Sequence, residues 1–238
     1  MYLGAGYLST PPNIYLFVLT PSPGPSNSYA WTAEAMLTQD RKFLFFDCET
    51  TGLPRSRYFS PDDVDGWPRL VQIAWARYDL QGNPEDARCH IVRPEGFEIP
   101  VDATRIHGIT QAHALQVGRE LAEVLDEFLE ACEQPGSTLV AHNLDYDCGV
   151  LGGELVRQNR PLRFLEIPGI CTMKSTTDLC RLPRPGGFGL KWPTLEELHI
   201  YVFGHSYQGA HDASSDLEAC ARSFFKLLQA GHYPLPGQ

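Results

Sequence analysis

One stretch decides the fold of this 238-residue chain: Phe43-Leu44-Phe45-Phe46-Asp47-Cys48-Glu49-Thr50-Thr51-Gly52. Its four leading apolar residues indicate a buried strand. Asp47 and Glu49, two residues apart, point to the same side of an extended backbone. Two carboxylates aimed at one spot repel each other unless a cation lies between them, and such oxygen-rich clusters suit hard divalent ions such as Mg²⁺ or Mn²⁺. The stretch therefore predicts a first strand that carries a metal site.

A second acidic motif, His142-Asn143-Leu144-Asp145-Tyr146-Asp147, follows the short strand predicted at residues 137–141. The next helix carries Asp147 on the same side as Val150 and Leu151, which points this carboxylate inward. The motif therefore predicts a third carboxylate near the first strand.

A third motif, His211-Asp212-Ala213-Ser214-Ser215-Asp216, opens the last helix. His211 precedes the helix and Asp216 lies a turn and a half later, so both side chains can face one cleft. Asp212 is the predicted N-cap of this helix, because a carboxylate there accepts hydrogen bonds from the first free backbone amides.

Together the three motifs resemble the DEDDh 3′→5′ exonucleases, the group that includes the proofreading subunit of DNA polymerase III. The closing His-x-Ala-x-x-Asp and the segment Ile106-His107-Gly108-Ile109-Thr110 are similar to segments of that family, and the resemblance runs from about Lys42 to about Leu228. It implies the ribonuclease H-like fold. The family has a variable residue where Asp145 stands and an aromatic residue at Tyr146, so Asp145 is not expected in the site.

The resemblance also implies the roles of the catalytic residues. Asp47 would bridge two divalent ions, Mg²⁺ or Mn²⁺, and Glu49, Asp147 and Asp216 would complete their shells. Two such ions roughly 3.5–4 Å apart can support the in-line displacement of a phosphodiester. His211 would be the general base, a role that histidine fills more often than any other residue.

Six substrate contacts are expected from the same resemblance: Thr50, Thr51, Leu53, His107, His142 and Asn143. The first three would hold the 3′ end with a backbone amide and an apolar wedge, and the two histidines would line the nucleotide pocket. The asparagine either hydrogen-bonds near the site or braces the end of its strand.

Other basic and aromatic residues are candidates for wider contact with a strand. Four cations in loops are either phosphate contacts or aids to solubility: Arg55, Arg57, Arg184 and Lys191. Trp67 and Trp192 are candidates for stacking on bases, whereas Trp75 lies in a predicted strand and is expected in the core.

The order of predicted elements indicates an α/β domain with a mixed central sheet flanked by helices. Strands are predicted at 43–47, 70–76, 89–92, 137–141 and 170–172, and helices at 117–132, from Asp147 onward, up to 182, at 194–203 and around 217–228. Thr194 and Glu197 predict a capping box, and residues 182–193 form a loop rich in proline and glycine.

Composition narrows the class of protein. A formal net charge of −10 argues against a large basic surface for gripping long duplexes and fits local contact with a strand end. The seven cysteines are scattered without a Cys-x-x-Cys pair, which predicts neither a disulfide framework nor a zinc site and favours the reducing cytoplasm.

The first 40 residues differ from the rest, because they contain no lysine or arginine and are punctuated by prolines. We expect a poorly ordered extension at 1–40, the exonuclease domain at 41–230 and a short tail at 231–238. Alternatively, Met36 is the biological start, or the extension is a processing or docking segment. The apolar run at 14–19 is far too short to span a bilayer, so no membrane association is expected.

The leading functional prediction is a metal-dependent 3′→5′ exonuclease that releases nucleoside monophosphates from single-stranded or frayed DNA. A close alternative prefers RNA or oligoribonucleotides, since contact with the 2′-hydroxyl cannot be inferred from these motifs. A third is a non-catalytic module that binds nucleic acid or a DNA polymerase, although such a binder has no need of four acids and a histidine. The predicted partners are nucleic acid and, in addition, a DNA polymerase.

Overall fold

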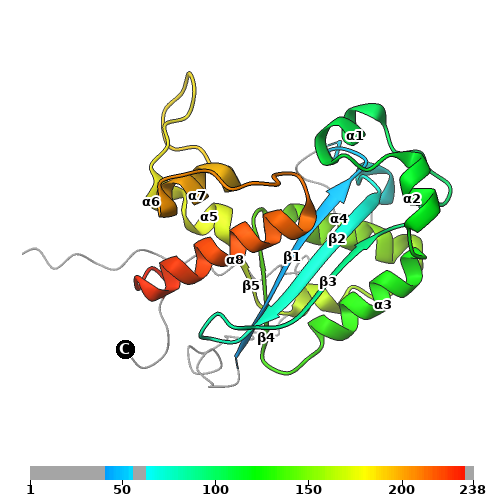
Figure 1. The fold of residues 1–238 in the computed structure, drawn as a ribbon, viewed down its shortest axis with the longest axis horizontal. Helices are drawn as coiled ribbons and strands as arrows, with labels where there is room; N and C mark the ends of the chain where they lie inside the picture. Colours follow the sequence, from blue (N-terminus) through cyan, green and yellow to red (C-terminus); the bar gives the residue numbers. More distant parts are fainter. Residues whose placement is uncertain (1–40, 56–62, 234–238) are drawn as a thin grey trace, which may run out of the picture.

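The fold is built on a five-stranded mixed sheet with strand order β3-β2-β1-β4-β5 (Figure 1). The computed structural model describes residues 41–55 and 63–233, so the predicted extension at 1–40, Arg57 and residues 234–238 lie outside it. The strands are β1 (Lys42–Thr50), β2 (Leu70–Tyr78), β3 (Pro84–Ile91), β4 (Ser137–Ala141) and β5 (Gly169–Cys171). Strand β2 pairs antiparallel with both β1 and β3, whereas β4 pairs parallel with β1, and β5 pairs parallel with β4. The predicted α/β class with a mixed sheet is confirmed.

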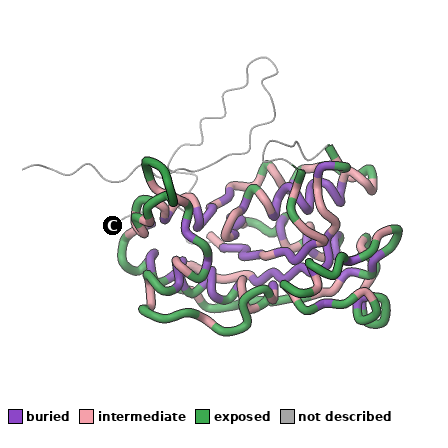
Figure 2. Tube along the Cα trace, turned by 90° about the horizontal axis from the view of Figure 1, so that it is seen from above, coloured by how far each residue is buried: buried purple, intermediate pink, exposed green. Residues whose placement is uncertain are grey.

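Strand β1 lies in the middle of the sheet and is covered on both faces. Its alternating side chains divide between two cores: Leu44 and Phe46 face one, and Phe43 and Phe45 face the other. The first core is completed by α3 (Leu121–Cys132) and α4 (Leu144–Arg157), and the second by α7 (Leu195–Phe203) and α8 (Ala213–Gln229). Figure 2 shows the buried residues concentrated between these layers.

Two short helices, α1 (Val101–His107) and α2 (Gln111–Val117), connect β3 to α3 and were not predicted. The helix predicted over residues 117–132 begins only at Leu121, because Gly118 ends α2 in an extended conformation. A Cβ atom at this glycine would lie 2.3 Å from the carbonyl oxygen of Ala114, so no other residue fits the turn. The prediction of a single helix over residues 117–132 was therefore wrong for its first turn.

Three other boundaries differ from the predictions. Strand β1 extends to Thr50, so that Asp47 and Glu49 lie within it. Strand β3 begins at Pro84 rather than Cys89, which an edge strand tolerates because its first residue need not donate a ladder hydrogen bond. The helix expected up to residue 182 is two short helices, α5 (Thr172–Ser175) and α6 (Thr177–Cys180).

The remaining elements are two 3₁₀ turns, η2 (Val64–Gly66) and η3 (Arg163–Glu166). All seven cysteines carry free thiols, as their scattered positions predicted. Within residues 41–55 and 63–233, no helix has both the length and the apolar character needed to cross a bilayer.

Candidate active site

Three carboxylates converge where β1 meets the start of α8. One oxygen each of Asp47, Glu49 and Asp216 lies within 4.8 Å of the other two. The first two point to the same side of β1 because they are two residues apart in an extended strand. Asp216 lies in the first turn of α8, where the partial positive charge of the helix N-terminus favours a carboxylate. The convergence joins residues from the two ends of the domain.

Asp147 is the fourth acid and is almost completely buried. It lies in the first turn of α4 and faces Cys48, which stands between the two acids of β1. All four acids line a single cavity of about 270 Å³. Every predicted site residue except Thr51 also lines this cavity.

The acids repel one another in the absence of a cation. Burial, followed by the charges of Asp147, Asp216 and Glu49, raises the pKa of Asp47 well above its ordinary value. Burial and the charge of Asp216 raise the pKa of Glu49 to about 7. Burial also raises the pKa of Asp216 and of Asp147. An all-oxygen donor set that is costly to ionise alone fits a hard divalent cation, which would neutralise the charge.

His211 lies at the mouth of the cavity with an exposed side chain. Its backbone has a φ of 69°, in the left-handed region, and its amide donates to both oxygens of Asp216, at 3.3 and 3.2 Å. The next residue, Asp212, caps α8 by accepting a hydrogen bond from the amide of Ser215 at 3.1 Å, as predicted. The turn thus places an imidazole beside a carboxylate of the cluster.

Two hydroxyl groups and an amide that the sequence did not assign to the site also support it. The Tyr207 hydroxyl donates to the carboxylate of Asp216 at 2.8 Å. Buried Gln72 of β2 accepts a hydrogen bond from the amide of Ala213 at 3.1 Å, which fixes the start of α8 against the sheet. Tyr146 donates to the carbonyl of Gly52 at 2.8 Å, so it holds the turn after β1. Tyr207 and Gln72 lie outside the three motifs, and no sequence signal points to them.

The predicted contacts after β1 divide between cavity and scaffold. Leu53 is 84% exposed at the rim, a suitable position for an apolar wedge. Thr50 lines the cavity, but its hydroxyl donates to the Gly52 carbonyl at 2.7 Å. Thr51 turns away, because its hydroxyl and its amide both bond to the backbone of Arg69. Its side chain therefore braces β2 and does not line the cavity.

The two predicted histidines differ in what their ring nitrogens do. His107 accepts a hydrogen bond from the amide of Ile109 at Nδ1, and its buried Nε2 makes no hydrogen bond within the described residues. His142 contacts the Thr172 hydroxyl with Nδ1, at 3.0 Å, and the Pro193 carbonyl with Nε2, at 3.1 Å. Burial lowers the pKa of His142 to about 4, so its ring stays neutral and braces the site.

Asn143 adopts a φ of 85° between β4 and α4, lines the cavity, and makes no side-chain cap. Asp145 is exposed and pairs with Lys174, outside the cluster, in agreement with its exclusion from the site. Asp145 and Asp147 are two residues apart in the first turn of α4, so the two carboxylates lie on different faces of the helix.

The predicted tryptophans and loop cations are scattered around the molecule. Trp75 is buried in the core as expected. Trp67 packs on α4, where a Cβ atom at Gly149 would lie 2.0 Å from its ring, so it serves the core and not base stacking. Trp192 is half exposed, and Lys191 pairs with Glu197.

Residues 44–224 match the exonuclease family RNase_T. The chain is similar to the PolC-type DNA polymerase III of Lactococcus lactis subsp. lactis (strain IL1403), with 32% identity over 187 residues, 79% of this chain and 10% of that protein. This chain therefore spans about 10% of the length of that relative.

Solved structures of Exonuclease I from E. coli share the fold. The complex with a dT13 oligonucleotide gives a TM-score of 0.64 at 21% identity, over 80% of this chain and 42% of that one. The zinc-bound form of its complex with single-stranded DNA gives a TM-score of 0.62 at 22% identity, over 79% and 41%. With the family match over most of the domain, the protein belongs to the RNase_T exonucleases, DnaQ-like DEDD nucleases of the ribonuclease H-like fold.

Proposed function

We propose that this exonuclease is metal-dependent, acts in the 3′→5′ direction, and removes nucleoside monophosphates from single-stranded or frayed DNA. The observation that carries the proposal is the convergence of Asp47, Glu49, Asp147 and Asp216 in one cavity with His211 at its mouth. The cavity, of about 270 Å³, is close to the lower limit for small-molecule pockets, roughly 300 Å³. A site of this size favours one terminal nucleotide over a continuous duplex.

The comparisons support DNA as the substrate. The Lactococcus relative is a DNA polymerase, and the E. coli Exonuclease I structures include complexes with DNA oligonucleotides. The net charge of −10 agrees with a substrate that is held at its end and not along its length.

The four acids are proposed to hold two Mg²⁺ or Mn²⁺ ions, and the zinc-bound Exonuclease I supports divalent metal at this fold. Bound there, the ions would neutralise the phosphoryl oxygens and stabilise the leaving oxygen. The protein's own groups complete the site. His211 would accept the proton of the attacking water, Tyr207 and the His211 amide hold Asp216 in place, and Leu53 would separate the last two bases.

The proposal is tested with matched DNA and RNA oligonucleotides, single-stranded and duplex, labelled at the 5′ end. With Mg²⁺ or Mn²⁺ we expect a ladder that shortens from the 3′ end, fastest on single-stranded DNA, and no cleavage in excess chelator. Faster cleavage of RNA would assign the enzyme to oligoribonucleotides instead. Cleavage of none of the four substrates would contradict the proposal and favour a binding module.

A DNA polymerase is the proposed protein partner, because the Lactococcus sequence that matches this domain is part of a polymerase chain. The seven free thiols fit a reducing compartment, and we propose the cytoplasm. Co-purification of a polymerase with the tagged protein from its own cells would test the partnership.

A further inference from the structure

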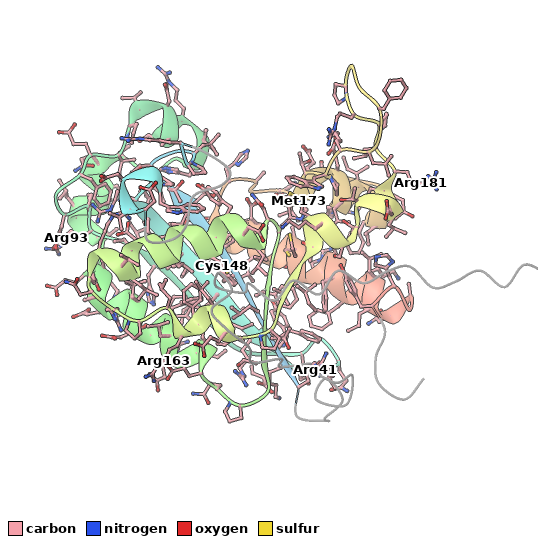
Figure 3. The ribbon with its side chains drawn as sticks, turned by 180° about the vertical axis from the view of Figure 1, so that it is seen from behind. Arg41, Arg93, Cys148, Arg163, Met173 and Arg181 are labelled. Carbon is pink, nitrogen blue, oxygen red and sulfur yellow. The ribbon has the colours of Figure 1, made fainter. Side chains whose placement is uncertain are left out.

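A hairpin-like loop projects from the molecule between α6 and α7. We define the hairpin as residues 182–192. Its arms pair through hydrogen bonds from the Arg184 amide to the Gly189 carbonyl, at 3.1 Å, and from the Lys191 amide to the Leu182 carbonyl, at 2.9 Å. In Figures 1 and 3 the hairpin and α1 project from the same edge of the molecule, and β1 ends beneath α1.

The root of the hairpin is fixed to the candidate active site. His142, which lines the cavity, bonds through Nε2 to the carbonyl of Pro193, directly after the hairpin. Lys191 is anchored to Glu197 of α7, with an Nζ–Oε2 distance of 2.6 Å. The four steps from residue 188 to residue 192 span about 13 Å in an extended arm. Each nucleotide of a stacked strand covers about 3.4 Å. A strand whose 3′ end lies in the cavity would therefore reach the tip of the hairpin after several nucleotides.

The hairpin presents exposed aromatic rings and an exposed arginine. Phe188 is fully exposed, and Trp192 at the base is half exposed. The aliphatic part of Arg184 lies beside Gly187, where an added Cβ atom would be 3.4 Å from it. The guanidinium of Arg184 makes no hydrogen bond or ion pair within residues 41–55 and 63–233. The ring of Phe188 and the side chain of Arg184 are therefore both exposed and open to a ligand.

Charge favours a polyanion as that ligand. Residues 179–195 contain no Asp or Glu, although the chain as a whole has a net charge of −10. Arg181 points away from α1 in Figure 3, so it is not part of the surface. The cation Arg184 with the rings of Phe188 and Trp192 gives the combination that binds single strands without sequence preference, namely positive charge for the backbone and aromatic faces for the bases.

We propose that the hairpin guides the single strand behind the terminal nucleotide, with Phe188 stacked on a base and Arg184 on a phosphate. This inference rests on the proposed nuclease function, which it extends from the 3′ end to the strand upstream. The hairpin adds affinity for long substrates only, because a substrate of two or three nucleotides ends before it reaches the tip.

The test compares oligothymidylates of about three and about fifteen nucleotides. Single-strand sites of this kind cover about 4–16 nucleotides, so the first substrate is too short for such a site and the second is long enough. For Phe188→Ala we expect KM on the long substrate to rise about 5- to 160-fold, the usual effect of removing one stacked ring, with kcat unchanged. Activity on the short substrate should stay at the wild-type level. Phe188→Tyr should keep KM on the long substrate at the wild-type value, because the aromatic face that stacks is retained. Phe188→Leu should raise KM as Phe188→Ala does.

Charge is tested separately with Arg184→Gln, which should reduce the salt dependence of binding by about one phosphate contact. Two controls change an aromatic ring and an arginine elsewhere on the surface: Tyr201→Ala, on α7, and Arg88→Gln, on β3. Neither should change KM at any length. Wild-type KM values in Phe188→Ala and Arg184→Gln would overturn the inference and leave the hairpin as a surface for a protein partner.

Failure of the inference can be separated from failure of the proposed function. If the wild-type protein cuts neither substrate, the nuclease proposal fails, and the hairpin is judged by binding alone. Fluorescence anisotropy with a labelled fifteen-nucleotide oligothymidylate in chelator should then still show weaker binding by Phe188→Ala. Equal binding by the variant and the wild type would overturn the inference as well.

Discussion

At the residue scale, His211 is set apart from the four acids by its exposure and its left-handed backbone. If it is the general base, His211→Ala should lower kcat by roughly 10²–10⁴-fold, the usual contribution of positioned proton transfer. The carboxylates remain in place, so the affinity for Mg²⁺ or Mn²⁺ should change little. Single-turnover cleavage and metal titration by calorimetry measure the two effects.

The neighbouring residue supplies the control. Asp212→Ala removes the cap of α8 and should cost about 1 kcal/mol of unfolding free energy with little loss of kcat. If Asp212→Ala were as inactive as His211→Ala, the roles of helix cap and general base would be contradicted. Near wild-type turnover by His211→Ala would contradict them too.

At the element scale, α4 presents two glycines to the Trp67 ring. A Cβ atom at Gly149 would lie 2.0 Å from the ring, whereas one at Gly153 would lie 3.2 Å from the Cβ of Trp67. Gly149→Ala should therefore destabilise the protein by about 1–3 kcal/mol, the usual cost of overpacking. Gly153→Ala should be close to neutral, because a milder contact is offset by about 0.5–1 kcal/mol of helix propensity. Urea unfolding of the two variants measures the difference, and equal stabilities would contradict the packing.

The same scale shows what the sequence can predict. Periodicity and caps were sufficient for β1, β4 and α7, whose capping box between Thr194 and Glu197 is present. Periodicity failed between β3 and α3, because α1 and α2 each have seven residues and expose apolar side chains such as Ile106. Tyr207 was beyond prediction, since a tyrosine in a loop acquires its role only when α8 brings Asp216 to it.

At the scale of the whole molecule, the acid cluster links stability to pH and to metal. The pKa of Glu49 is raised from 4.5 to about 7 in the metal-free fold, so the folded state holds this proton more tightly than the unfolded chain. The stability that this proton contributes is complete below pH 4.5 and is lost as the pH rises through about 7. In chelator, Glu49→Gln should therefore gain stability relative to the wild type across this window.

The comparison between the two proteins cancels the titration of groups that do not interact with Glu49, such as His142, whose lowered pKa acts in the opposite direction. Mg²⁺ or Mn²⁺ should raise the melting temperature of the wild type above pH 7 more than that of the variant, because binding to the native state alone stabilises it. Thermal melts from pH 5 to pH 8, with and without metal, test the linkage. If the melting temperatures of the two proteins differed by the same amount at every pH, the titration of Glu49 would not be the cause of the link between stability and pH.

The packing of α8 on β1 has a consequence for synthesis. Phe43 and Phe45 of β1 lie against Phe224, with ring centroids 4.9 and 5.4 Å apart, so the first strand of the described residues is covered by α8, the last of their helices. While a ribosome is still extending the chain, that phenylalanine face has nothing to pack against, and exposed apolar surface of this kind promotes aggregation. The nascent protein should therefore depend on a chaperone until residue 229 has left the exit tunnel, and its domain should close in one late step.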